Sequence, residues 1–89
     1  MNDPQKKAQA LIEYLSARND ADAISKEKLT DASQLILHHE WGVALENLME
    51  VLYEQEFQWD EKGLRIAEEA WLAAGLDWNI WKSLLKTGS

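Results

Sequence analysis

The apolar residues of this chain recur every three or four positions, which is the spacing of one face of an α-helix. The first stripe follows Asp3, which can serve as an N-cap, and predicts a helix ending near Arg18, with Pro4 at its first position. After a polar turn at residues 19–22, a second helix capped by Ser25 is predicted to run to about residue 38. The expected core residues are Ala8, Leu11, Ile12 and Leu15 in the first helix, and Leu29, Ala32, Leu35 and Ile36 in the second.

The same spacing predicts three further helices. A third covers about residues 41–55, and Asp60 can cap a fourth, with Trp59 packing on Leu64 as a hydrophobic staple. Gly75 is expected to end the fourth helix in a left-handed conformation, and Asp77 to start a short last one. The expected core residues are Trp41, Ala44, Leu45, Leu48, Val51 and Leu52, then Gly63, Ile66, Ala67, Ala70, Trp71 and Ala74, and finally Ile80, Trp81 and Leu84.

This pattern predicts an all-α fold, a compact single-domain bundle of four to five short antiparallel helices over residues 1–89. The chain has no cysteine for a disulfide, but 46% of its residues are apolar and five are tryptophans, which suffices for a small core. The pattern leaves open whether residues 87–89 are a frayed native end or a remnant of expression. It also leaves the oligomeric state open.

The net charge of -7 lies entirely in one segment. Seven acidic residues lie between Glu40 and Glu61 with no Lys or Arg among them, whereas the remaining nine acids are balanced by nine basic residues. This segregation predicts a positively charged partner. Nucleic acid and anionic membrane surfaces would be repelled, and no apolar run is long enough for a membrane span or a leader, so the expected location is the cytoplasm.

Three of these acids are predicted to form a row along the third helix, called here the acidic ladder: Glu46, Glu50 and Glu54. On a helical wheel they lie about 140°, 180° and 220° from Trp41, opposite the core stripe. Like charges four residues apart destabilise a helix by about 0.2–0.5 kcal/mol per pair. Because Val43, Asn47 and Tyr53 share this face, with Phe57 just beyond, it resembles a protein-binding surface more than a purely solvated one.

The sequence offers little support for catalysis or metal binding. His38 and His39 are adjacent, so a helix would point them about 100° apart, and no third His or Cys completes a ligand set. The chain lacks a Cys nucleophile and a glycine-rich phosphate loop. We therefore expect no enzyme activity, no metal and no cofactor, and place both histidines at a corner between helices.

The run from His39 to Leu48, with the sequence HEWGVALENL, is followed by Leu52-Tyr53-Glu54. Together they resemble the central motif of the MafI-like immunity proteins, small helical bacterial proteins that protect against polymorphic toxins and contact-dependent growth inhibition. The stretch from Ile66 to Leu76 is similar to the next helix of that family, so the resemblance covers about residues 35–76. The family pattern has Gly at the position of His39.

The resemblance implies an antidote that binds and neutralises a cognate toxin domain, expected to be a basic nuclease. Its Lys and Arg residues, needed to attract phosphates, would be a target for carboxylates. An acidic adaptor that docks a basic cellular protein is the alternative. Glu40 and Glu46 could instead brace the corner before the third helix. The predicted partner-binding residues are Glu46, Asn47, Glu50, Tyr53 and Glu54, flanked by Glu40, Glu56, Trp59, Asp60 and Glu61.

Overall fold

The computed structural model describes residues 3–17 and 26–84, apart from the side chains of Ile80, Ser83 and Leu84. The described part is all-α and contains no strand, which confirms the predicted fold class. Its helices are α1 (Pro4–Ala17), α2 (Lys26–Leu37), α3 (Trp41–Glu54), α4 (Glu61–Ala73) and α5 (Asn79–Leu84). The predicted turn at residues 19–22, the Ser25 cap, the helix end at Arg18 and the question of residues 87–89 lie outside the described residues.

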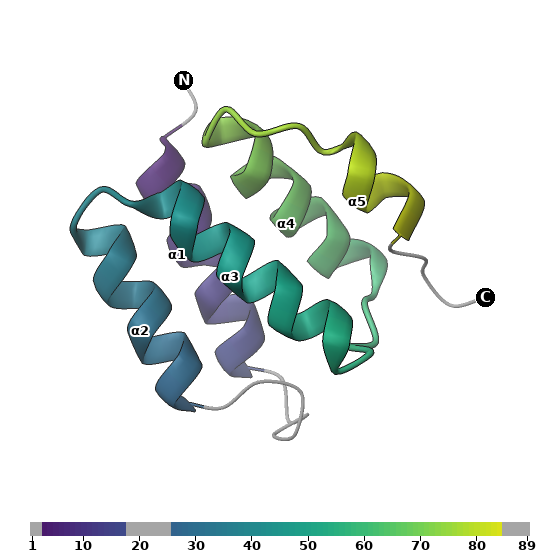
Figure 1. Cartoon of the computed structure of the whole chain (residues 1–89), viewed down its shortest axis with the longest axis horizontal. Coiled ribbons are helices and arrows are strands. Elements are labelled where there is room, and N and C mark those ends of the chain that lie inside the picture. Colours follow the sequence, from purple (N-terminus) through teal and green to yellow (C-terminus); the bar gives the residue numbers. More distant parts are fainter. Residues whose placement is uncertain (1–2, 18–25, 85–89) are drawn as a thin grey trace.

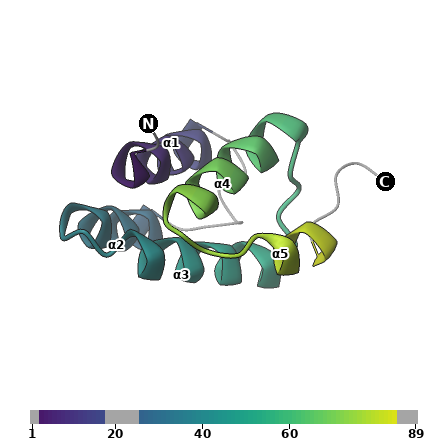
Figure 2. The same ribbon diagram turned by 90° about the horizontal axis from the view of Figure 1, so that it is seen from above.

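The four longer helices form two layers (Figures 1 and 2). In one layer α1 packs against α4, and in the other α2 packs against α3, while α1 also rests on α2. The short α5 lies beside α3 at the edge of the second layer (Figure 2). One side of α3 is therefore covered by the bundle, and its opposite side faces outward.

The apolar stripes form one core between the layers. The four predicted core residues of α1 are all buried, and in α3 the core also takes Met49, which the prediction had omitted. Trp41, Val51, Leu29, Leu35, Ile66 and Ala74 are only partly buried, so they form the margins of the core. The fully buried large side chains are Leu11, Ile36, Leu45, Met49 and Leu52.

At the start of three helices, an aspartate carboxylate accepts hydrogen bonds from backbone N–H groups. The Asp3 carboxylate accepts hydrogen bonds from the backbone N–H groups of Gln5 and Lys6, which confirms the predicted cap of α1. Asp60 caps α4 by accepting from the N–H of Gly63 at 2.7 Å. Asp77 accepts from the N–H of Asn79 at 2.9 Å and so forms the turn that leads into α5.

Three helices end in the same backbone motif. At the ends of α2, α3 and α4, one residue has a positive φ: His39 (63°), Glu56 (55°) and Gly75 (81°). In each case the backbone N–H of the following residue donates to the carbonyl five residues before it. The three bonds run from Glu40 to Leu35, from Phe57 to Leu52 and from Leu76 to Trp71. Gly75 confirms the prediction. At His39 and Glu56, a side chain occupies a conformation that glycine adopts without steric cost.

Tryptophans attach α5 to the rest of the molecule. The ring of Trp71 in α4 contacts Trp78 and Trp81, with centroids 6.2 and 5.9 Å apart, and its indole N–H donates to the carbonyl of Asp77 at 2.8 Å. Tyr53 of α3 meets the other part of this cluster through Trp81, at 6.0 Å. Side-chain aromatic contacts therefore hold α5 in place.

Gly63 allows α1 and α4 to approach closely. A Cβ added at Gly63 would lie 2.7 Å from Cε2 of Tyr14 and closer still to its hydroxyl oxygen, a contact that side chains do not tolerate. That hydroxyl donates to the Asp60 carboxylate at 2.7 Å, so the ring is held against the first turn of α4. Any larger residue at position 63 would therefore force the Tyr14 ring to move.

We expect Gly63→Ala to lower the free energy of unfolding by about 1–3 kcal/mol, because the methyl group displaces the Tyr14 ring from the Asp60 carboxylate. Gly42→Ala is the matched control. A Cβ at Gly42 meets nothing within 4 Å, so this substitution should raise the free energy of unfolding by up to about 1 kcal/mol through helix propensity. Urea unfolding followed by circular dichroism measures both. Equal effects would contradict the proposed role of Gly63.

The left-handed residues give a second prediction. Glu56→Gly and His39→Gly should each raise the free energy of unfolding by about 0.5–1 kcal/mol, because the left-handed strain exceeds the entropy that glycine adds to the unfolded chain. Gly75→Ala should lower it by about 1–2 kcal/mol for the converse reason. The same urea experiment checks all three variants. A loss of stability in both glycine variants would mean that the side chains at 39 and 56 stabilise the fold.

Candidate protein-binding face

The acidic ladder lies on the outward side of α3, as predicted. Glu46, Glu50 and Glu54 are all exposed, and the buried residues of α3 lie on the opposite side of the helix. Within the part of the chain that the structure describes, the ion pair found joins Lys7 of α1 to Glu69 of α4, with Nζ and Oε1 3.0 Å apart, and involves no ladder residue. The ladder carboxylates therefore have no basic partner among the described residues.

One flank of the ladder borders a groove between α2 and α3. This α2/α3 groove has a volume of about 250 Å³. Two of the predicted binding residues, Asn47 and Glu50, belong to its lining. The groove is lined by Lys28, Asp31, Ala32 and Leu35 of α2 and by Asn47, Leu48, Glu50 and Val51 of α3.

The other flank of the ladder is aromatic. Tyr53 lies about 120° from Trp41 around the helix, on the opposite side of the ladder from Asn47 at about 240°. Tyr53 is 48% exposed, and its ring meets Trp81 of α5 edge to face. Val43, which is 50% exposed, adds apolar surface at the start of α3. The predicted face is therefore a continuous strip with a groove on one side and a half-exposed tyrosine on the other.

Two flanking acids lie at the ends of α3. Glu40 is the N-cap residue, but its side chain makes no cap hydrogen bond; the corner is closed by its backbone, whose N–H bonds to Leu35 and whose carbonyl accepts from Ala44. Glu56 is the left-handed residue that ends the helix. Both side chains are exposed. Neither Glu40 nor Glu46 has a side-chain interaction that braces the corner within the described residues.

The prediction that Trp59 flanks the binding face as a partner-binding residue is wrong, whereas the expectation that it packs inward agrees with its burial. Trp59 is only 6% exposed and packs edge to face against Phe57, with ring centroids 4.9 Å apart. Its ring also stacks on Tyr14 at 6.4 Å. Phe57, expected just beyond the acidic face, is buried too. The connection between α3 and α4 folds inward, so its aromatic residues complete the core instead of facing a partner.

Asp60 also has a structural role. Its carboxylate accepts from both the Gly63 N–H and the Tyr14 hydroxyl, each at 2.7 Å, so one side chain caps α4 and ties it to α1. Glu61 follows in the first turn of α4, where a carboxylate is favoured by the positive end of the helix dipole. The candidate face is thus limited to α3 and the residues at its ends, because Trp59 and Asp60 have structural roles.

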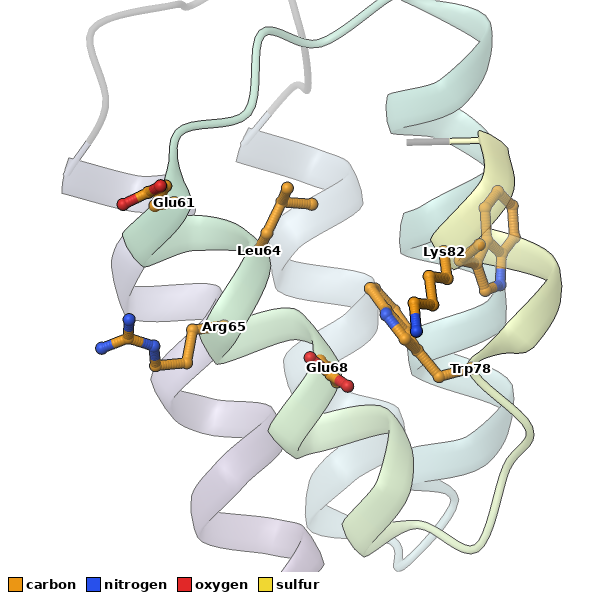
Figure 3. Close-up of a pocket in the computed structure, with 7 residues that line it drawn as sticks. Glu61, Leu64, Arg65, Glu68, Trp78 and Lys82 are labelled. Carbon is orange, nitrogen blue, oxygen red and sulfur yellow. The ribbon is translucent and has the colours of Figure 1, made fainter. Parts of the chain in front are cut away.

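A second groove lies between α4 and α5 (Figure 3). This α4/α5 groove has a volume of about 370 Å³, and sequence analysis did not predict it because it depends on where α5 docks. Figure 3 shows Lys82 beside Trp78, whereas Arg65 extends away from α5. The charges of the two acidic and two basic residues in the lining of this groove cancel, so the groove favours neither a positive nor a negative ligand. It is lined by Glu61, Leu64, Arg65, Glu68, Trp78, Trp81 and Lys82.

The histidines lie at the α2–α3 corner. His38 and His39 are exposed, and the ring of His39 meets Trp41 edge to face at 5.4 Å. No group of three or more His, Cys, Asp or Glu side chains that could hold a metal ion occurs in residues 3–17 and 26–84. Likewise, none of the helices described here is sufficiently long and apolar to cross a membrane.

Comparisons of the chain with protein-family models, with curated proteins and with solved structures gave no match.

The structural role of Asp60 predicts a difference between two neighbouring acids. Asp60→Ala should lower the free energy of unfolding by about 2 kcal/mol, since it removes a helix cap and the acceptor for Tyr14. Glu61→Ala makes the same change in charge, but should alter stability by no more than about 0.5 kcal/mol. Urea unfolding of both variants checks this, and similar losses would show that Asp60 does not hold α1 and α4 together.

Proposed function

We propose that this protein is a bacterial immunity protein that binds and neutralises a cognate toxin domain through the outer face of α3. The observation that carries the proposal is the acidic ladder: three exposed carboxylates in a row, without a basic partner among the described residues. A toxin surface rich in Lys and Arg would supply the missing positive charge. The chain would act in the cytoplasm by binding alone, with no catalytic step.

The energetics of α3 support a role other than stability. Each ladder pair, Glu46 with Glu50 and Glu50 with Glu54, costs the helix about 0.2–0.5 kcal/mol. The acid at Glu56 adds left-handed strain that a glycine would avoid. Charged side chains at positions where another residue would make the fold more stable are typical of residues selected for binding.

The resemblance to the MafI-like family supports the same proposal through the backbone. The family pattern has a glycine at the position of His39, and His39 has a φ of 63°, the region where glycine is favoured. The resembling segment, about residues 35–76, runs from the end of α2 through α3 to the glycine that ends α4. The motif thus coincides with one structural unit, the corner and the two helices after it.

A nuclease is the toxin class that best fits an acidic antidote. An enzyme that binds a phosphate backbone must carry Lys and Arg around its cleft. A rigid helix presents carboxylates at a fixed spacing, which speeds association with such a surface, while Tyr53 and Val43 provide apolar contact that slows dissociation. The proposal therefore specifies a stoichiometric complex with a basic toxin domain.

Replacing Glu46, Glu50 and Glu54 together with Lys tests the proposal. The partner is the toxin domain encoded directly upstream, the usual position of a toxin gene relative to its immunity gene. We expect the variant to keep its helicity, because the ladder residues are exposed and make no contacts that the fold needs. Its association rate at low salt should fall at least about 10-fold, and it should no longer protect cells.

The matched control is a triple variant with the same change in charge on three other helices. Glu13, Glu27 and Glu68 are exposed on α1, α2 and α4, and their replacement with Lys gives the same net charge as the ladder variant. This control should bind the toxin with nearly unchanged affinity. If the ladder variant still protects cells, and binds at an unchanged rate across a salt series, the outer face of α3 is not the binding surface.

A further inference from the structure

The α2/α3 groove combines an apolar floor with charged walls. Ala32 and Leu48 are buried, and the partly buried Leu35 and Val51 adjoin them, so the bottom of the groove is aliphatic. The helices that form it lie side by side in one layer of the molecule (Figures 1 and 2). A side chain entering this groove would therefore pass polar atoms at the rim and meet methyl groups at the bottom.

The rim carries acceptors on both walls. Asp31 of α2 and Glu50 of α3 are exposed carboxylates that line the groove, and Asn47 adds an amide oxygen next to Glu50. Lys28 is the one basic residue in the lining, so the net charge of the groove is negative. Glu50 is also the middle rung of the acidic ladder. The groove thus opens directly onto the proposed binding face.

An arginine side chain matches both parts of the groove. Its aliphatic stem can lie on apolar surface while its charged end stays at the rim. The planar guanidinium presents five N–H donors in a fixed fork, which can address carboxylates on two walls at once. A lysine would offer a single point charge that is more strongly hydrated. Arginine is also enriched among the residues that contribute most to protein interfaces.

We infer that the α2/α3 groove receives an arginine side chain of the partner protein, held between Asp31 and Glu50 with its stem on Leu48 and Val51. This inference rests on the proposed function for the partner's identity, and on the groove itself for the chemistry of the occupant. It names Asp31, which lies outside the acidic segment from Glu40 to Glu61, as a binding residue. The approach of a basic toxin to the ladder would then be fixed in register by one inserted side chain.

The first experiment probes the groove without any toxin. N-acetyl-arginine methylamide is titrated into the isotope-labelled protein, and backbone amide shifts are followed by NMR. We expect saturable shifts centred on Leu35, Leu48 and Val51, with weaker or absent shifts for the citrulline analogue, which keeps the shape but lacks the charge. Shifts that are equal for both probes, or spread evenly along α3, would overturn the inference.

The second experiment compares two variants of equal charge in the toxin-binding assay. Asp31→Asn with Glu50→Gln removes both groove carboxylates, whereas Glu46→Gln with Glu54→Gln removes the two ladder carboxylates outside the groove lining. The groove variant should lose at least about 10-fold in affinity, mainly through faster dissociation, and clearly more than the ladder variant. Equal losses in the two variants would overturn the inference, even if the proposed function holds.

The outcomes separate the two proposals. If the arginine probe occupies the groove but neither these variants nor the lysine ladder variant affects toxin binding, the proposed binding face fails, and so does the inference that the groove receives an arginine of the toxin. If the lysine ladder variant abolishes toxin binding while the arginine probe leaves the groove unperturbed, the inference about the groove fails and the proposed function stands.

Discussion

The hydrogen bonds that converge on Asp60 determine how α1 and α4, the two helices of one layer, are held against each other. One carboxylate caps α4 through Gly63 and accepts from Tyr14 of α1, so the start of one helix is fixed against the side of another. Tyr14 in turn stacks on Trp59, which closes the core beneath the α3–α4 connection. This connection follows directly on the end of α3, so the contacts of Asp60, Tyr14 and Trp59 fix the path of the chain from α3 to α4.

The ends of α3 show how a short helix can be oriented without extensive caps. At its N-terminus, Glu40 has no side-chain cap bond, and the left-handed residue His39 turns the chain from α2 instead. At its C-terminus, Glu56 does the same, and Phe57 is drawn into the core directly afterwards. Backbone motifs at both corners thus orient α3, so its exposed side chains are not needed to cap the helix.

Sequence periodicity could predict the helices, their aspartate caps and the outward ladder, because each depends on residues close together in the chain. It placed Phe57 just beyond the acidic face and counted Trp59, expected to pack as a staple, among the partner-binding residues as well. Both are buried, since a connection has no repeat from which to read a buried side. It also missed Met49, which lies at the margin of the apolar stripe and is buried only because the bundle covers that margin. Both grooves depend on which helices become neighbours, so no local pattern predicts them.

The division of the acidic segment follows from the same physics. An acid at a helix start, such as Asp60, stabilises the fold because its oxygen meets unpaired N–H groups. An acid in the middle of an outward face, such as Glu50, has no such compensation and repels its neighbours. Two carboxylates of equal charge in one segment thus have opposite effects on folding. Stability therefore accounts for Asp60 but not for Glu50, and the proposed binding to a positive partner offers a reason for Glu50, which lines the groove together with residues of α2.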